Sequence, residues 1–469
     1  MDPVHAAKEV AENAPILMDV KFWSACGIFG VALFLIITEK IDKTVAAIFG
    51  SALVLVSGIL TYEGAFHVIG TGVDWNVIFL LIGMMIIINI MRPTGVFEYV
   101  AFKGAQLGRG EPIRIMIIFS IITAISSAFL DNVTTVLLLA PVTLLIADAL
   151  EINPIPFLIV EALASNIGGT ATLIGDPPNI MIASKAHLSF MDFFYNLAPI
   201  VSIMCMVCGI VLWLFFRKKL KASEKNKAKI MNMNVREAIK DPVSLRKSLF
   251  VLGVVLVGFM LHGVLHLQPS VIALFGAGLL LVISNPDHEK VHKVLAEVEW
   301  NVIFFFIGLF IMVGGLVEVG AIKWLSQQML DATKGNMIAT ATVIMWFSAV
   351  ASAVVDNIPY VATMNPLVID MAKELWPNLS GVDLLQHPDL MPIWWSEALG
   401  ACLGGNGSPI GASANVIVIG MAAKAGYKIS TKEFVSYGIP VVMLTVTMSM
   451  IYVWWRYYSI ADGWGLMFG

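Results

Sequence analysis

Long apolar stretches alternate with short polar connections along almost the entire chain, from Phe22 to Trp455. Many of these stretches match the roughly 17 to 25 residues that a helix needs to cross the hydrocarbon core of a bilayer. Seven precede one long polar stretch and seven follow it, at about 20–38, 44–60, 75–91, 113–130, 134–150, 155–182 and 193–216, then 249–265, 270–284, 300–317, 338–355, 360–373, 393–423 and 434–455. The pattern predicts an all-α polytopic membrane protein.

Composition supports this prediction and excludes other classes. Hydrophobic residues make up 58% of the 469 residues and charged residues 13%, whereas soluble domains carry about 25% charged residues. A water-soluble enzyme is therefore excluded, and a net charge of −4 gives no field that would attract nucleic acid. The chain has no Walker A motif and no glycine fingerprint after a strand, so we expect neither a cofactor nor direct use of ATP.

The four cysteines and the N-terminus suggest no further chemistry. Cys26, Cys205, Cys208 and Cys402 all lie in apolar runs, which is typical of thiols packed in the membrane, and we expect no disulfide and no metal site. The segment Met1–Asp19 is acidic and lacks the basic start and small-residue cleavage site of a signal peptide. We therefore expect the first apolar run to be a retained span.

An internal repeat organises the chain. Trp75–Phe79 recurs as Trp300–Phe304, and the pair Asp131-Asn132 recurs as Asp356-Asn357, all at an offset of 225 residues. Gly83, Gly95 and Pro141 follow the same offset; beyond an insertion near residues 376–392 it becomes 236, which pairs Glu161 with Glu397, Gly168-Gly169 with Gly404-Gly405, Gly175 with Gly411 and Asn179 with Asn415. The two halves are copies of one unit.

Two kinds of segment in each copy do not read as simple spans. The runs around Asp131 and Asp356 place an acid and an amide between two short apolar stretches, which favours a re-entrant hairpin with a polar tip. The runs at 155–182 and 393–423 are interrupted by Gly, Pro and polar residues, which predicts broken helices. Non-helical backbone at membrane depth must line a cavity enclosed by protein, because hydrocarbon cannot hydrate it.

Each hairpin makes no net crossing, so each half has five crossings and the two repeats are expected to be inverted. The expected parts are an extracytoplasmic segment 1–19, a first membrane repeat 20–216, a basic cytoplasmic linker 217–247, a second, inverted repeat 248–456 and a tail 457–469. By the positive-inside rule the linker, and the loops that carry Lys40, Lys43 and Arg92, lie in the cytoplasm, and both termini lie outside. The location expected is a bacterial-type inner (plasma) membrane.

Two tips and two broken helices related by a pseudo-twofold axis are expected to converge on one site. The residues expected to bind substrate or ion are Asp131, Asn132, Thr134, Asn166, Thr170, Thr172, Asp176, Asn179, Asp356, Asn357, Asn406, Ser408 and Asn415, joined by Thr135 and Ser413. A carboxylate that has lost its hydration needs a cation, hydrogen-bond donors or a proton, so it can exchange a proton for another ligand. Asp176, Asp131 and Asp356 are the candidates for proton coupling.

Structural roles compete with this interpretation. Asp131 and Asp356 are equally suited to cap the helices that follow them, and the two roles are compatible. Asp176 is the best candidate for a functional carboxylate, because its counterpart in the second repeat is Ala412 and the repeat architecture does not require it. Glu161 and Glu397 are as well explained by packing.

The stretches from Ser126 to Thr135 and from Asn166 to Asn179 resemble the signature of the arsenite-permease/sodium-proton antiporter (ArsB/NhaD) branch of the ion transporter superfamily, and are most similar to its members like the P protein. The resemblance covers about Trp75 to Trp455. It implies a scaffold domain, an elevator-type transport domain and a homodimer. Dicarboxylate carriers of this superfamily have Ser-Asn-Thr at the tips, whereas this chain has acidic tips, which argues against an anionic substrate.

The function expected is a secondary active transporter that exports a small inorganic solute, preferably arsenite or antimonite, in exchange for protons. Arsenous acid is neutral at pH 7, so amides, hydroxyls and carboxylates suffice to bind it, and Cys402 permits a thiol contact. Sodium-proton antiport is the alternative, because carboxylates supply the oxygen ligands that hard cations prefer. A carboxylate carrier, an ion channel and the membrane subunit of an ATP-driven pump, with an ATPase partner at the linker, remain open.

Overall fold

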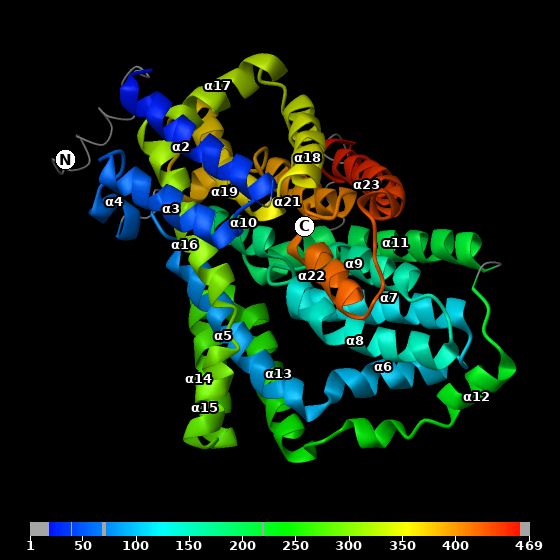
Figure 1. The fold of residues 1–469 in the computed structure, drawn as a ribbon. Helices are drawn as coiled ribbons and strands as arrows, with labels where there is room; N and C mark the ends of the chain where they lie inside the picture. The colour runs from blue at the N-terminus through cyan, green and yellow to red at the C-terminus, as the bar shows by residue number, and fades with distance from the viewer. Residues whose placement is uncertain (1–17, 39, 68–71, 218–219, 460–469) are drawn as a thin grey trace.

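The computed structural model describes residues 18–38, 40–67, 72–217 and 220–459, and in these ranges the chain is helical and has no strands (Figure 1). Nine helices of the described residues are long and apolar enough to cross a bilayer. The all-α membrane architecture expected from the sequence is confirmed. The segment 1–19 and the tail 457–469 lie almost entirely outside the described residues.

Each repeat contributes the same series of helices. The first repeat consists of α2 (Val20–Ile37), α3 (Lys43–Val56), α4 (Tyr62–Phe66), α5 (Trp75–Met91), α6 (Val96–Leu107), α7 (Pro112–Phe129), α8 (Asn132–Leu150), α9 (Ile155–Gly169), α10 (Pro177–Ala186) and α11 (Phe190–Phe216). The second consists of α13 (Pro242–Leu265), α14 (Pro269–Ser284), α15 (His288–Ala296), α16 (Trp300–Glu318), α17 (Ala321–Thr333), α18 (Met337–Val354), α19 (Asn357–Leu375), α21 (Met391–Gly404), α22 (Ser413–Lys424) and α23 (Thr431–Val453), with the short α20 (Gly381–Leu385) in the insertion.

Packing between the helices follows the repeat. Helix α3 packs against α16, and the equivalent pair, α14 and α5, packs in the same way. The contacts of α7 with α9 and of α8 with α22 are likewise repeated by α18 with α21 and by α19 with α10. Each of these contacts thus has a partner in the other half, which is the arrangement expected of a pseudo-twofold axis between the two repeats.

Both expected hairpins and both expected breaks are present. Helices α7 and α8 meet at Asp131, and α18 and α19 meet at Asp356. Helix α9 ends at Gly169 and α10 starts at Pro177, while α21 ends at Gly404 and α22 starts at Ser413. The first hairpin can lie close to the first broken helix because Gly168 packs directly on the backbone of Ala124, where a Cβ atom would overlap it.

The linker between the repeats is partly helical and is fixed to the first hairpin. Helix α12 (Glu224–Met231) carries Lys227, whose ammonium donates to Glu111 Oε1 at 2.5 Å and to Glu224 Oε1 at 2.7 Å. These hydrogen bonds raise the pKa of Lys227. A second ion pair joins Lys229 to Glu151 at 3.2 Å. Since Glu111 precedes α7 and Glu151 follows α8, the linker holds both ends of the hairpin.

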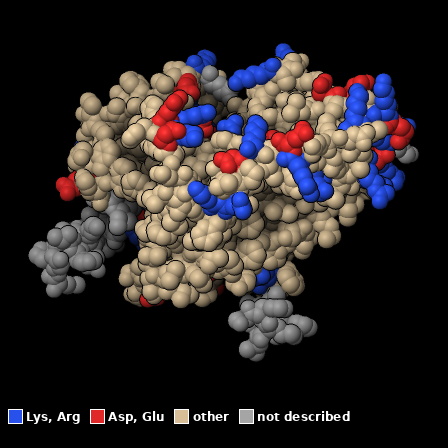
Figure 2. Space-filling view, turned by 90° about the horizontal axis from the view of Figure 1, so that it is seen from below, with Lys and Arg blue, Asp and Glu red and all other residues tan. Residues whose placement is uncertain are grey.

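Charged side chains are distributed unevenly over the face shown in Figure 2. Figure 2 looks at the molecule from the lower side of Figure 1, and there Lys, Arg, Asp and Glu gather in one part of the face beside a broad uncharged area.

Helix α13 begins at Pro242, within the stretch that the sequence predicts as linker. Its apolar run starts only near Leu249, so the polar first turn hid the start of the helix.

Candidate functional site

The two hairpin tips are built in the same way. Asp131 accepts a hydrogen bond from the backbone N–H of Thr134 at 2.8 Å and caps α8. Asp356 accepts from the N–H of Ile358 at 3.2 Å and caps α19. The capping role that the sequence suggested for both acids is therefore present, and each cap places an asparagine at the first position of the following helix.

These two asparagines converge on Asp176. The amide nitrogen of Asn132 donates to Asp176 Oδ1 at 3.1 Å, and that of Asn357 donates to Asp176 Oδ2 at 3.2 Å. All three side chains are buried, and Asp176 is fully enclosed. In the described part of the chain no Lys or Arg forms an ion pair with Asp176, so its polar contacts are with uncharged groups. One carboxylate thus lies between the two repeats, held by one amide from each tip.

A second layer of amides connects the two broken helices. Asn166 of α9 donates to the side-chain oxygens of Asn406 at 2.9 Å and Asn415 at 3.1 Å, and its own oxygen accepts from Asn132 at 3.2 Å. Asn406 in turn donates to the carbonyl of Leu163 at 3.4 Å. The network therefore runs from the first tip through α9 to the second break.

Other predicted site residues form hydrogen bonds to the backbone where the two helices are interrupted. Asn179 donates to the carbonyls of Gly169, Thr170 and Thr172, and its counterpart Asn415 donates to those of Gly405 and Ser408 at 2.8 and 2.9 Å. The hydroxyls of Thr172 and Ser408 bond to the equivalent carbonyls of Ala128 and Ala353, and that of Thr170 bonds to Asn166 O at 2.8 Å. These side chains satisfy backbone groups that the interrupted helices leave open.

Two buried oxygens beside this network have no hydrogen-bond partner among the described residues. They are Asn132 Oδ1 and, one turn further along α8, Thr135 Oγ1. Buried polar atoms are nearly always paired, so these two oxygens have the capacity to accept a hydrogen bond from a ligand or a water molecule.

The structure adds one residue that sequence reasoning placed elsewhere. The charge pattern predicts a cytoplasmic loop around Lys43, whereas in the structure Lys43 is the first residue of α3. Its ammonium lies 2.8 Å from Asp356 Oδ2 and 2.8 Å from Ser413 Oγ. The signal was available, because Lys43 opens an apolar run and its counterpart in the second repeat is the uncharged Gln268. Like Asp176, Lys43 breaks the symmetry of the repeats.

The remaining candidates lie at the edge of the network. Glu161 accepts a short hydrogen bond from Thr143, whereas both carboxyl oxygens of Glu397 are buried without a partner among the described residues. The thiol of Cys402 donates to Asn179 Oδ1 at 3.4 Å and lies close to Asp176. No group of His, Cys, Asp and Glu side chains suited to a metal ion occurs in the part of the chain that the structure describes.

A wholly helical, pseudo-twofold molecule with a buried carboxylate between two hairpin tips has the architecture of a membrane transporter. Its fold is similar to that in the crystal structure of the YdaH transporter of Alcanivorax borkumensis, with a TM-score of 0.57 and 12% identity over 95% of this chain and 99% of that one. At this identity the likeness shows the fold alone. The chain belongs to the citrate transporter family, whose model matches residues 33–400.

Similar sequences occur in bacteria and mammals. An uncharacterized transporter of Mycobacterium tuberculosis is 46% identical over 93% of this chain and 99% of its own length. The human P protein is 31% identical over 96% of this chain and 63% of its own length. The resemblance to the P protein is thus confirmed, and so is the prediction of a membrane transporter. Assignment to the ArsB/NhaD branch stays a prediction.

Proposed function

We propose that this transporter is a secondary carrier that exports a small inorganic solute, preferably arsenite or antimonite, in exchange for protons. The observation that carries the proposal is the Asp176 carboxylate, which is fully buried and held by the neutral amides of Asn132 and Asn357. A buried carboxylate without a cation is stable when it is protonated or when a ligand satisfies its oxygens. Proton and solute would therefore compete for Asp176, which is the basis of exchange.

The surroundings of Asp176 fit a neutral hydroxylated solute. Arsenous acid carries three hydroxyl donors, and Asp176 and Asn132 Oδ1 provide acceptors for them. Cys402 places a soft sulfur ligand near the same carboxylate, and soft ligands favour a soft metalloid. In one state the solute occupies these acceptors, and in the other state a proton on Asp176 replaces it.

Transport in everted membrane vesicles tests this proposal. With an imposed proton gradient we expect radiolabelled arsenite to accumulate without sodium movement, and Asp176→Asn to reduce accumulation to that of vesicles without the protein. Asp383→Asn, at an exposed position of α20, is the matched control and should transport normally. Normal accumulation by Asp176→Asn would remove Asp176 from the mechanism.

Sodium-proton antiport is the second candidate. Asp176 and the unpaired oxygens of Asn132 and Thr135 are hard ligands of the kind that Na⁺ prefers. In the same vesicles this function would appear as a collapse of the proton gradient on addition of sodium, with arsenite inert.

The family name brings a third candidate, a carrier of citrate or another carboxylate. Lys43 is a cation at the second tip that could attract an anion, but it is already paired with Asp356. Uptake of labelled citrate, with neither arsenite nor sodium moving, would favour a carboxylate carrier.

Movement of none of the three solutes would point to a channel, or to the membrane subunit of a pump with an ATPase docked at the linker.

A further inference from the structure

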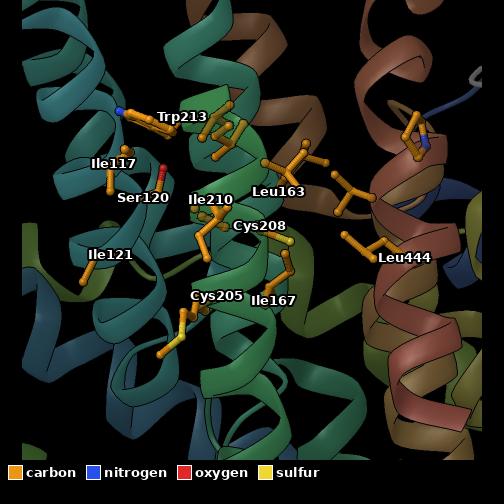
Figure 3. Close-up of a pocket in the computed structure, with 18 residues that line it drawn as sticks. Ile117, Ser120, Ile121, Leu163, Ile167, Cys205, Cys208, Ile210, Trp213 and Leu444 are labelled. Atoms are coloured by element: carbon orange, nitrogen blue, oxygen red, sulfur yellow. The ribbon is translucent and has the colours of Figure 1, made fainter. Parts of the chain in front are cut away.

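An apolar cavity lies apart from the asparagine network, between α7, α9, α11 and α23 (Figure 3). Its volume is about 440 Å³, within the range of roughly 300 to 1,000 Å³ that is typical of small-molecule sites. Helix α9 contributes Leu163, Ala164 and Ile167 to its wall, whereas Asn166 is not among the lining residues and bonds to the second break instead. One helix thus separates the cavity from the network.

The side chains that line the cavity are almost all apolar. Aliphatic side chains from all four helices form most of the wall, and the polar side chains that reach it are Ser120, Cys205, Cys208 and Trp213. The Ser120 hydroxyl is already bonded to Met116 O at 2.7 Å. A charged or strongly polar molecule would lose its hydration here without compensation, so an alkyl chain is the occupant that the chemistry favours.

Positive charge lies at one end of the cavity. Figure 3 shows Trp213 at the end away from Cys205, and the guanidinium of Arg217 lies over the Trp213 ring at 4.6 Å from its centre. Arg217 begins the basic linker, whose exposed Lys221 and Lys225 follow within nine residues. Basic side chains beside a membrane helix attract anionic headgroups, and tryptophan is enriched at the headgroup level.

We propose that this cavity binds one acyl chain of an anionic phospholipid whose phosphate pairs with Arg217. The chain would fill the space between α9, which carries Asn166, and the long helices α11 and α23. A bound acyl chain would then pack against α9 on the side away from the asparagine network and help to hold that helix in place. This site is independent of the transported solute.

Gly209 offers a direct way to close the cavity. It lines the wall, and a Cβ atom built there meets no other atom within 4 Å, so Gly209→Phe can enter the cavity without displacing backbone. Gly253 of α13 is equally open but lies outside the cavity, which makes Gly253→Phe the matched control.

Native mass spectrometry of the purified protein, with phosphatidylglycerol or phosphatidylcholine added, tests the proposal. We expect the wild type and Gly253→Phe to retain one phosphatidylglycerol in preference to phosphatidylcholine, and Gly209→Phe to lose it. Arg217→Gln should retain both lipids equally. Retention by Gly209→Phe equal to that of the wild type, or an unchanged preference in Arg217→Gln, would overturn the proposal.

Thiol labelling provides a second readout that does not depend on a folding difference between variants. Cys205 and Cys208 line the cavity, while Cys26 lies in α2, outside it. Phosphatidylglycerol should slow the reaction of N-ethylmaleimide with the two cavity cysteines and leave that of Cys26 unchanged. Equal rates with and without the lipid would count against an occupied cavity.

Discussion

The ion pair between Lys43 and Asp356 is expected to contribute more to stability than an ion pair on the surface. Its pair with Asp356 is largely screened from solvent, since the side chains are 31% and 8% exposed. Lys43→Gln leaves a buried carboxylate without its cation, so we expect a loss of about 1 to 3 kcal/mol of unfolding free energy, discounted for the exposed lysine. The measurement is thermal unfolding in detergent.

A matched exposed pair serves as the control for that prediction. Lys290 and Asp287 lie 3.6 Å apart with side chains 72% and 63% exposed. Lys290→Gln should change the free energy by less than about 1 kcal/mol. An equal effect of the two substitutions would show that Asp356 does not depend on Lys43.

At the residue scale, the sequence identifies candidates but not their partners. Asp176 could be singled out because its counterpart is Ala412, an asymmetry that needs no structure. That Asn132 and Asn357 both donate to Asp176 could not be foreseen, because the three residues come from different elements and their contact depends on side-chain direction. Their role in transport stays a prediction.

At the scale of the elements, the close approach of α7 to α9 depends on a residue without a side chain. A Cβ atom at Gly168 would overlap the backbone of Ala124, and backbone cannot move aside as a flexible side chain can. We expect Gly168→Ala to lower the unfolding free energy by about 1 to 3 kcal/mol through overpacking. Thermal unfolding of the variant measures this.

Gly253→Ala distinguishes packing from helix propensity. The added methyl group at Gly253 meets no atom within 4 Å, so only the helical preference of alanine remains, worth about 0.5 to 1 kcal/mol in favour of the folded state. The two Gly→Ala changes should therefore have opposite signs. If Gly168→Ala were as stable as Gly253→Ala, the α7–α9 contact would be looser than described.

Most elements could be predicted because their signals are local. Apolar runs, the repeat offset and the Gly and Pro interruptions predicted the hairpins at Asp131 and Asp356 and both breaks. Helix α12 could not be recognised, because it is polar and is held by ion pairs to Glu111 and Glu151, which are distant in sequence. Long-range contacts of this kind leave no local pattern.

At the scale of the whole molecule, orientation in the bilayer is the open prediction. The basic linker is expected in the cytoplasm and α20 outside. In a variant without the native cysteines, Asp383→Cys should react with an impermeant maleimide in intact cells, whereas Lys225→Cys should react only after permeabilisation. Both positions are exposed, so accessibility itself does not differ between them. The opposite pattern would reverse the assigned topology.

Asp176 has Ala412 as its counterpart in the second repeat, and this asymmetry has a consequence for the energetics of transport. The broken helices therefore contribute a single carboxylate, that of Asp176, to the space between the two tips. In the proposed exchange, neutral arsenous acid leaves as one proton enters at Asp176, so each cycle moves one net charge across the bilayer. Such a carrier is electrogenic, so the membrane voltage drives it as well as the pH difference, and its rate should respond to valinomycin and potassium.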